Sequence, residues 1–192
     1  MKTSPQSISP AHTAQCLDCD RGMTSPGRKR VPIETRLVVV EGYGEKAALE
    51  YLRSVANIRG EGFTTSIRCA RGGSPSHIVQ HIINQTVFTA FERRFVVFDA
   101  DRYDVEEQLK VKNLIEGTEI TVIVSEPNFD ELILRTLGER PPFRNAKAAL
   151  VRRLGGPLEE SGSYAGSLTL PVLTDARRSE PSINDILRIF GR

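Results

Sequence analysis

The sequence predicts an α/β fold, in which helices cover both faces of a mostly parallel sheet and a helical extension follows at the C-terminus. Short runs of β-branched and aromatic residues, such as 37–40 and 95–98, alternate with longer amphipathic segments. Continuous apolar runs of this kind are typical of strands that are buried on both faces. Strands that alternate with helices imply right-handed crossovers between parallel neighbours.

The first half of the core begins with a strand at 36–40, which a Gly-Tyr-Gly turn separates from a helix at about 45–56. That helix places Ala48, Leu49, Leu52 and Val55 on one face, as a buried helix requires. A glycine-rich loop leads to a second strand at 64–69. The Gly-Gly-Ser-Pro segment at 72–75 then breaks the chain and starts a helix that we expect to continue to about Phe91.

The second half of the core repeats the alternation. A strand at 95–98 is followed by a helix at about 105–115, which Gly117 closes, and by a strand at 120–124. A helix at about 129–137 and a Pro-Pro break end the core. The extension contains helices at about 146–154 and 183–190, with a glycine- and serine-rich loop near 155–167 between them.

Composition indicates one domain with additions at each end. The chain has 192 residues, 39% of them hydrophobic, and can bury a core without help from disulfides. Its three cysteines are too few and too irregular for a disulfide framework. We expect a flexible arm at 1–34, which is rich in Ser, Thr, Pro, Gly and charge, an α/β core at 35–140, and a helical extension at 141–192 that packs on the core.

Charge and hydropathy exclude few classes of function. The 26 basic and 24 acidic residues give a net charge of +2, which neither requires nor rules out a nucleic-acid partner. No apolar run approaches the roughly 18 residues of a membrane span, and the N-terminus lacks the apolar core of a signal peptide. We therefore expect a soluble, cytoplasmic protein without a membrane partner.

Carboxylates follow two of the predicted strands. Glu41 comes directly after the run 37–40, and Asp99 and Asp101 come directly after the run 95–98. Open α/β sheets bind ligands at the carboxyl ends of their strands, so these acids can converge although they lie about 60 residues apart. Such a cluster repels itself unless a proton or a cation such as Mg²⁺ neutralises it. The alternative to a cation site is that these acids are simply exposed to solvent at the strand ends.

The same motifs carry a family resemblance. A strand followed by Glu41-Gly42 and, about 55 residues later, a strand followed by Asp99-Ala100-Asp101 resembles the Toprim domain of topoisomerases, primases and OLD-type nucleases. The RloB-like branch of Toprim proteins is more similar still. Its basic opening stretch appears here at 28–30, its Glu-Gly-x-x-Glu sequence at 41–45, and its Ser-Asn-Pro-x-Phe-Glu segment at 125–130 as Ser-Glu-Pro-Asn-Phe-Asp. The resemblance covers about residues 34–140 and implies a Toprim-like, Rossmann-like core.

The resemblance also implies roles for individual residues. Glu41 is expected to be the general acid/base or a metal ligand, and Asp99 and Asp101 are expected to hold Mg²⁺ or Mn²⁺. Supporting roles fall to Glu45, Glu126 and Asp130. Two of these depart from the family pattern, since Glu126 stands where Asn is usual and Asp130 stands where Glu is usual. Stabilising the first turn of its helix is an equally good explanation for Glu45.

The implied activity is metal-dependent phosphodiester hydrolysis in DNA or RNA, in phage defence or DNA processing. Candidate contacts to nucleic acid are the basic residues Arg71, Arg102, Arg152 and Arg153. The alternative is that these arginines are ordinary surface residues without a binding role. A second hypothesis is a non-catalytic nucleic-acid-binding or scaffold subunit of a multi-protein defence system. A third is a small-molecule phosphatase that uses the same acids. An ATPase or other defence protein as partner, and homo-oligomer formation, stay open.

Overall fold

The computed structural model describes residues 34–56, 62–87 and 89–192. Its centre is a four-stranded sheet in the order β2-β1-β3-β4, with every neighbouring pair parallel. The strands are β1 (Glu34–Val40), β2 (Phe63–Cys69), β3 (Arg93–Asp99) and β4 (Ile120–Ser125). The predicted parallel α/β architecture is confirmed, whereas residues 1–33 of the predicted arm lie outside the described part of the chain.

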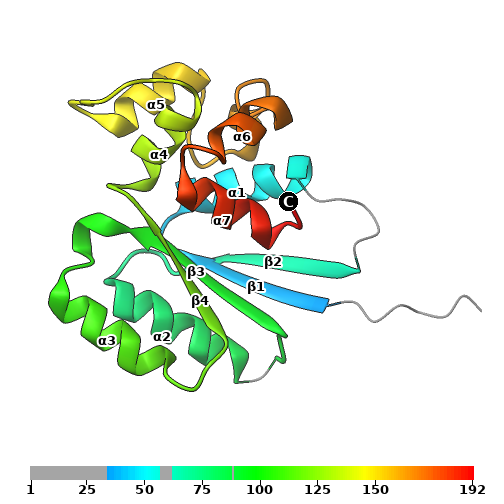
Figure 1. The fold of residues 1–192 in the computed structure, drawn as a ribbon, viewed down its shortest axis with the longest axis vertical. Helices are drawn as coiled ribbons and strands as arrows, with labels where there is room; N and C mark the ends of the chain where they lie inside the picture. Colours follow the sequence, from blue (N-terminus) through cyan, green and yellow to red (C-terminus); the bar gives the residue numbers. More distant parts are fainter. Residues whose placement is uncertain (1–33, 57–61, 88) are drawn as a thin grey trace, which may run out of the picture. The chain divides into compact units, whose positions relative to one another are not determined.

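Helices cover both faces of this sheet (Figure 1). Two of them, α2 (Pro75–Thr86) and α3 (Val105–Ile115), lie on one face. The other side carries α1 (Tyr43–Ala56), α4 (Phe129–Thr136), α5 (Ala146–Leu154), α6 (Leu170–Ala176) and α7 (Pro181–Ile189). Two short 3-10 helices complete the described elements, η1 (Ala100–Arg102) after β3 and η2 (Ser161–Tyr164) before α6.

The two central strands, β1 and β3, alternate their side chains between two apolar cores, which explains why their sequences are continuous apolar runs. Val38 and Val40 of β1 point into the core beneath α1, α4 and α7, whereas Leu37 and Val39 point into the core beneath α2 and α3. All four side chains are fully buried. The arrangement is Rossmann-like, with burial on both faces fixing the register of the central strands.

The C-terminal helices share the larger of these cores. Ile183, Ile186 and Phe190 are fully buried there. The buried Arg36 of β1 donates hydrogen bonds to the carbonyls of Arg188 and Ile189 at the end of α7. A cation on a helix C-terminus is favourable because unpaired carbonyls gather there.

Two element predictions were wrong. The helix that we expected to continue to about Phe91 ends at Thr86, whose hydroxyl donates back to the Ile83 carbonyl at 2.8 Å. Beyond it Val87 is 66% exposed, so this residue does not extend the buried face of α2. We did not predict α6, which buries Leu173 and Ala176 next to the glycine- and serine-rich loop. None of the helices in the described ranges has the length and apolar character of a membrane span.

Candidate functional site

The predicted acids lie at the carboxyl ends of two adjacent strands. Val40 of β1 is in register with Val97 of β3, so Glu41 and Asp99 leave the sheet side by side. Asp101 follows two residues later in η1, whose 3-10 turn directly continues β3. Parallel pairing thus brings together residues that are far apart in the sequence, at the edge where open sheets bind ligands.

Asp99 is fixed by the first residue of α4. The backbone N–H of Phe129 donates to Asp99 Oδ1 at 2.8 Å, which ties the end of β3 to the N-terminus of that helix. The pKa of Asp99 is raised to about 7, chiefly by burial and in part by the charges of Glu45, Glu41 and Asp101, while the hydrogen bond from Phe129 opposes the shift. The carboxyl group therefore changes protonation close to neutral pH.

Glu41 is half-buried on the other strand. Burial raises its pKa, the guanidinium of Arg102 opposes this, and the carboxylate of Asp101 reinforces it. Because Asp101 acts on the pKa of both Glu41 and Asp99, the three predicted acids form one electrostatic group. Of the predicted basic residues, Arg102 is thus placed beside an acid of this group.

Glu45 joins the group because its side chain folds back over Gly42. A Cβ atom on Gly42 would lie 2.6 Å from Glu45 Oε2, so any larger residue at 42 displaces this carboxylate. Burial raises the pKa of Glu45, the charge of Glu41 raises it too, and the Gly42 amide and Lys147 oppose the shift. Position 42 therefore accepts a larger residue only if the flexible Glu45 side chain moves its carboxylate away.

Asp130 extends the group onto α4. Its pKa is raised to about 6, chiefly by burial and in part by the charge of Glu45, while the charge of Lys147 opposes the shift. We call the five residues Asp101, Glu41, Asp99, Glu45 and Asp130 the acid row. Two cations act on the row, because the charge of Arg102 lowers the pKa of Glu41 and the charge of Lys147 lowers that of Asp130.

Tyr164 of η2 is a buried residue close to the row that was not predicted from the sequence. Its hydroxyl donates to the Leu158 carbonyl at 3.0 Å, with the Gly44 carbonyl also within reach at 3.3 Å. Burial raises its pKa, and the charges of Asp130 and Glu45 raise it further. The phenol therefore stays neutral and anchors the start of α1 to the C-terminal extension.

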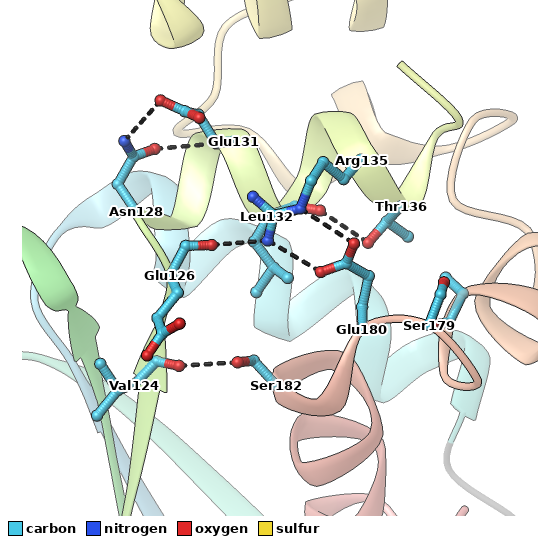
Figure 2. A network of polar contacts seen from close by, with 11 residues as sticks. Val124, Glu126, Asn128, Glu131, Leu132, Arg135, Thr136, Ser179, Glu180 and Ser182 are labelled. Atoms are coloured by element: carbon cyan, nitrogen blue, oxygen red, sulfur yellow. Dashed lines mark hydrogen bonds and ion pairs between the residues drawn. The ribbon is translucent and has the colours of Figure 1, made fainter. Parts of the chain in front are cut away.

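A polar network joins the segment between β4 and α4 to the start of α7 (Figure 2). Arg135 on α4 donates from Nε and Nη2 to the two carboxylate oxygens of Glu180, at 3.0 and 2.9 Å, and from Nη2 to the Glu126 carbonyl at 2.6 Å. Ser182 donates to the Val124 carbonyl at 2.8 Å, and the Asn128 side chain caps α4. The network holds the helix end whose N–H binds Asp99.

Other predicted residues do not join the row. Glu126 contributes its backbone carbonyl to this network, while its exposed carboxylate is not among the charges that shift the acid row. Arg71 is exposed in the loop after β2, with a φ of +65°. Arg152 and Arg153 lie on α5 and line a separate groove with Arg140.

The chemistry of the row suits a hard cation, although its present geometry is open. Carboxylate oxygens are the ligands that Mg²⁺ and Mn²⁺ prefer. The raised pKa values reflect burial first and neighbouring negative charge second, and a bound cation would relieve the cost of both. Within the described ranges, no three His, Cys, Asp or Glu side chains converge on one point as metal ligands do. The residues therefore supply suitable donor atoms, which do not converge on one point in this arrangement.

Comparison of the chain with protein-family models, with curated proteins and with solved structures finds no match.

Proposed function

We propose that this chain is a Toprim-like protein of the RloB-like kind, in which the acid row uses Mg²⁺ or Mn²⁺ to hydrolyse a phosphodiester bond in nucleic acid. The observation that carries the proposal is the position of Glu41 and Asp99 at the ends of adjacent parallel strands, with Asp101 in the same electrostatic group. A role in phage defence or DNA processing rests on the sequence resemblance alone.

The cation would be held by Glu41, Asp99 and Asp101, and it would supply charge neutralisation at the phosphoryl group and orientation of the attacking water. The protein residues supply the remaining functions of the site. Phe129 N–H occupies Oδ1 of Asp99 and leaves Oδ2 without that hydrogen bond. Arg102 places positive charge next to Glu41, where a phosphate oxygen of the substrate would approach.

Proton transfer falls to the carboxyl groups whose pKa is raised. Asp99, with a pKa of about 7, holds a proton below neutral pH when no cation is bound. Glu41, whose pKa burial raises, is the residue that the resemblance assigns as general acid/base. A carboxyl group with a raised pKa is a better general acid near neutral pH than an ordinary one.

A non-catalytic nucleic-acid-binding or scaffold subunit is the second candidate. It is favoured by one observation, namely that no three possible ligands converge in the described part of the chain. In that case the row would bind a cation weakly or not at all, and the chain would act through a partner. A third candidate, hydrolysis of small phosphate esters, gains no support from any particular contact.

The deciding experiment is a cleavage assay on single-stranded and duplex DNA and RNA with Mg²⁺, Mn²⁺ or EDTA. We expect cleavage with either metal and none with EDTA. Glu41→Gln, Asp99→Asn and Asp101→Asn should each reduce the rate at least a hundredfold in a folded protein. Asp175→Asn, which removes an exposed charge on α6, is the matched control. Metal-independent cleavage, or full activity in all three variants, would refute the proposal.

A further inference from the structure

A groove between α4 and α5 combines an apolar floor with a basic rim. Its volume is about 440 Å³, and Leu134, Phe143 and Ala149 form the floor. Leu134 is fully buried, whereas Phe143 is half-buried and lines the groove. A volume of this size falls within the range of ordinary ligand sites.

The rim is strongly basic. The segment 139–153 carries five basic side chains against one acidic side chain, Glu139. Arg153 forms an ion pair with Glu139 at 3.3 Å, so its positive charge is partly neutralised. Arg140 and Arg152 also line the groove, are exposed, and form no ion pair with any residue that the structure describes. Two guanidinium groups are therefore available to an anionic ligand above an apolar surface.

The groove lies next to the acid row. Asp130, a member of the row, and Leu134, in the floor, are four residues apart on α4 and thus share a face about 6 Å apart along the helix axis. Lys147 of α5, the helix that carries Arg152, lies close enough to the row to lower the pKa of Asp130. A chain that lies in the groove therefore continues toward the row.

We propose that this arginine groove binds single-stranded nucleic acid next to the cleavage site, with Arg140 and Arg152 on backbone phosphates and an unpaired base on the Phe143 floor. The inference rests on the proposed function and specifies its substrate class. Basic side chains beside an accessible aromatic ring are the usual composition of single-strand sites, because the ring can stack only on a base that is free of its own partner. In a duplex the bases are already stacked and the Phe143 floor has nothing to bind.

The test is fluorescence anisotropy of labelled 12-nucleotide single strands and of the matching duplex, with the full chain in EDTA so that no cleavage occurs. The wild-type protein should bind a single strand at least fivefold more tightly than the duplex. Arg140→Gln/Arg152→Gln should weaken binding at least tenfold and reduce the slope of log K against log[salt] by about 1.4. Arg178→Gln/Arg188→Gln, which removes the same charge from exposed positions on the extension, should leave both quantities nearly unchanged.

The floor is tested separately by Phe143→Leu, which preserves apolar volume and should fold as the wild type does by circular dichroism. It should lose about fivefold in affinity for single strands and nothing for the duplex. The inference is overturned if wild-type protein does not bind at micromolar concentration, or if the double arginine variant binds as the wild type does. Equal affinity for duplex also overturns it, and so does equal competition by a poly-glutamate peptide, which would point to an acidic protein segment.

These results are distinguishable from failure of the proposed function. Asp175→Asn, which removes an exposed charge on α6 outside both the row and the groove, should retain full binding in EDTA. A wild-type protein that binds single strands through Arg140 and Arg152 but cleaves nothing with Mg²⁺ or Mn²⁺ would refute the proposed nuclease activity. The same result would support single-strand binding by the arginine groove. Cleavage that proceeds unchanged in Arg140→Gln/Arg152→Gln would refute the role of the groove in substrate binding. The proposed nuclease activity of the acid row would still stand.

Discussion

Replacing Asp99 by Asn should stabilise the cation-free protein at alkaline pH. The pKa of this carboxyl group is raised from its ordinary 3.8 to about 7 in the folded state. The native protein therefore binds the proton more tightly than the unfolded chain, and stability is lost as pH rises from about 4 to about 7. Above pH 7 the loss is constant, because both states are then ionised.

The size of the effect follows from the same two values. Each pH unit between them costs up to about 1.4 kcal/mol, so ionisation of folded Asp99 costs at most about 4 kcal/mol. Solvent screening at this partly exposed edge reduces the expected cost to about 2 kcal/mol. Asn retains an Oδ1 acceptor for the Phe129 N–H and removes the charge, so it should avoid the cost without losing the hydrogen bond.

The assay is urea unfolding of both proteins in EDTA at several pH values between 4 and 8. The free energy of unfolding of Asp99→Asn should exceed that of the wild type by about 2 kcal/mol at pH 8, and the difference should vanish near pH 4. Asp175→Asn, on an exposed side chain, should track the wild type throughout. A variant that is less stable than the wild type at pH 8, or a difference that does not change with pH, would refute the reasoning.

Three further predictions follow from single contacts. Gly42→Ala should displace the Glu45 carboxylate, whose Oε2 lies 2.6 Å from the added Cβ, and should weaken Mn²⁺ binding at least fivefold in calorimetry with little change in urea midpoint. Glu180→Gln should cost about 1–3 kcal/mol in urea unfolding, because Arg135 loses its charged bidentate partner in a half-buried site. Glu107→Gln should lower stability at pH 7, because the Ser76 N–H holds the pKa of Glu107 at about 2.

A different result would contradict each of these three predictions. The Gly42 prediction fails if Mn²⁺ affinity is unchanged in the alanine variant. The Glu180 prediction fails if its cost is no larger than that of Asp175→Asn, which breaks a fully exposed pair of 4.0 Å. A depressed pKa contributes stability above 4.5 and loses it as pH falls toward 2, so a cost of Glu107→Gln that does not shrink between pH 5 and pH 3 would contradict that account.

The sheet and its carboxylate edge could be predicted because burial on both faces leaves a strong local signal. The runs before Glu41 and Asp99 contain only apolar residues, and the order of strands and helices fixes parallel pairing. The bounds of α3 and α5 agree with the expected 105–115 and 146–154, since the Asp104 and Asn145 side chains cap their N-termini and a glycine with positive φ follows each C-terminal end. Local pattern and tertiary structure agree at these places.

Elsewhere tertiary structure decided the outcome. The apolar residues after Thr86 suggested a longer α2, but periodicity cannot tell which of them find a partner in the fold. The start of α6 did leave a signal, since Pro171 lies in its first turn. Arg135 and Glu180 left none, because 45 residues separate the two halves of their ion pair.

Isothermal titration calorimetry of Mn²⁺ into the wild-type protein tests the central claim that Glu41, Asp99 and Asp101 act as one cation site. At pH 6 we expect one binding event with release of about one proton, because a cation displaces the proton that Asp99 holds there. Glu41→Gln, Asp99→Asn and Asp101→Asn should each abolish it, whereas Asp175→Asn should not. Absence of binding in the wild type, or binding that survives in all three variants, would contradict the account.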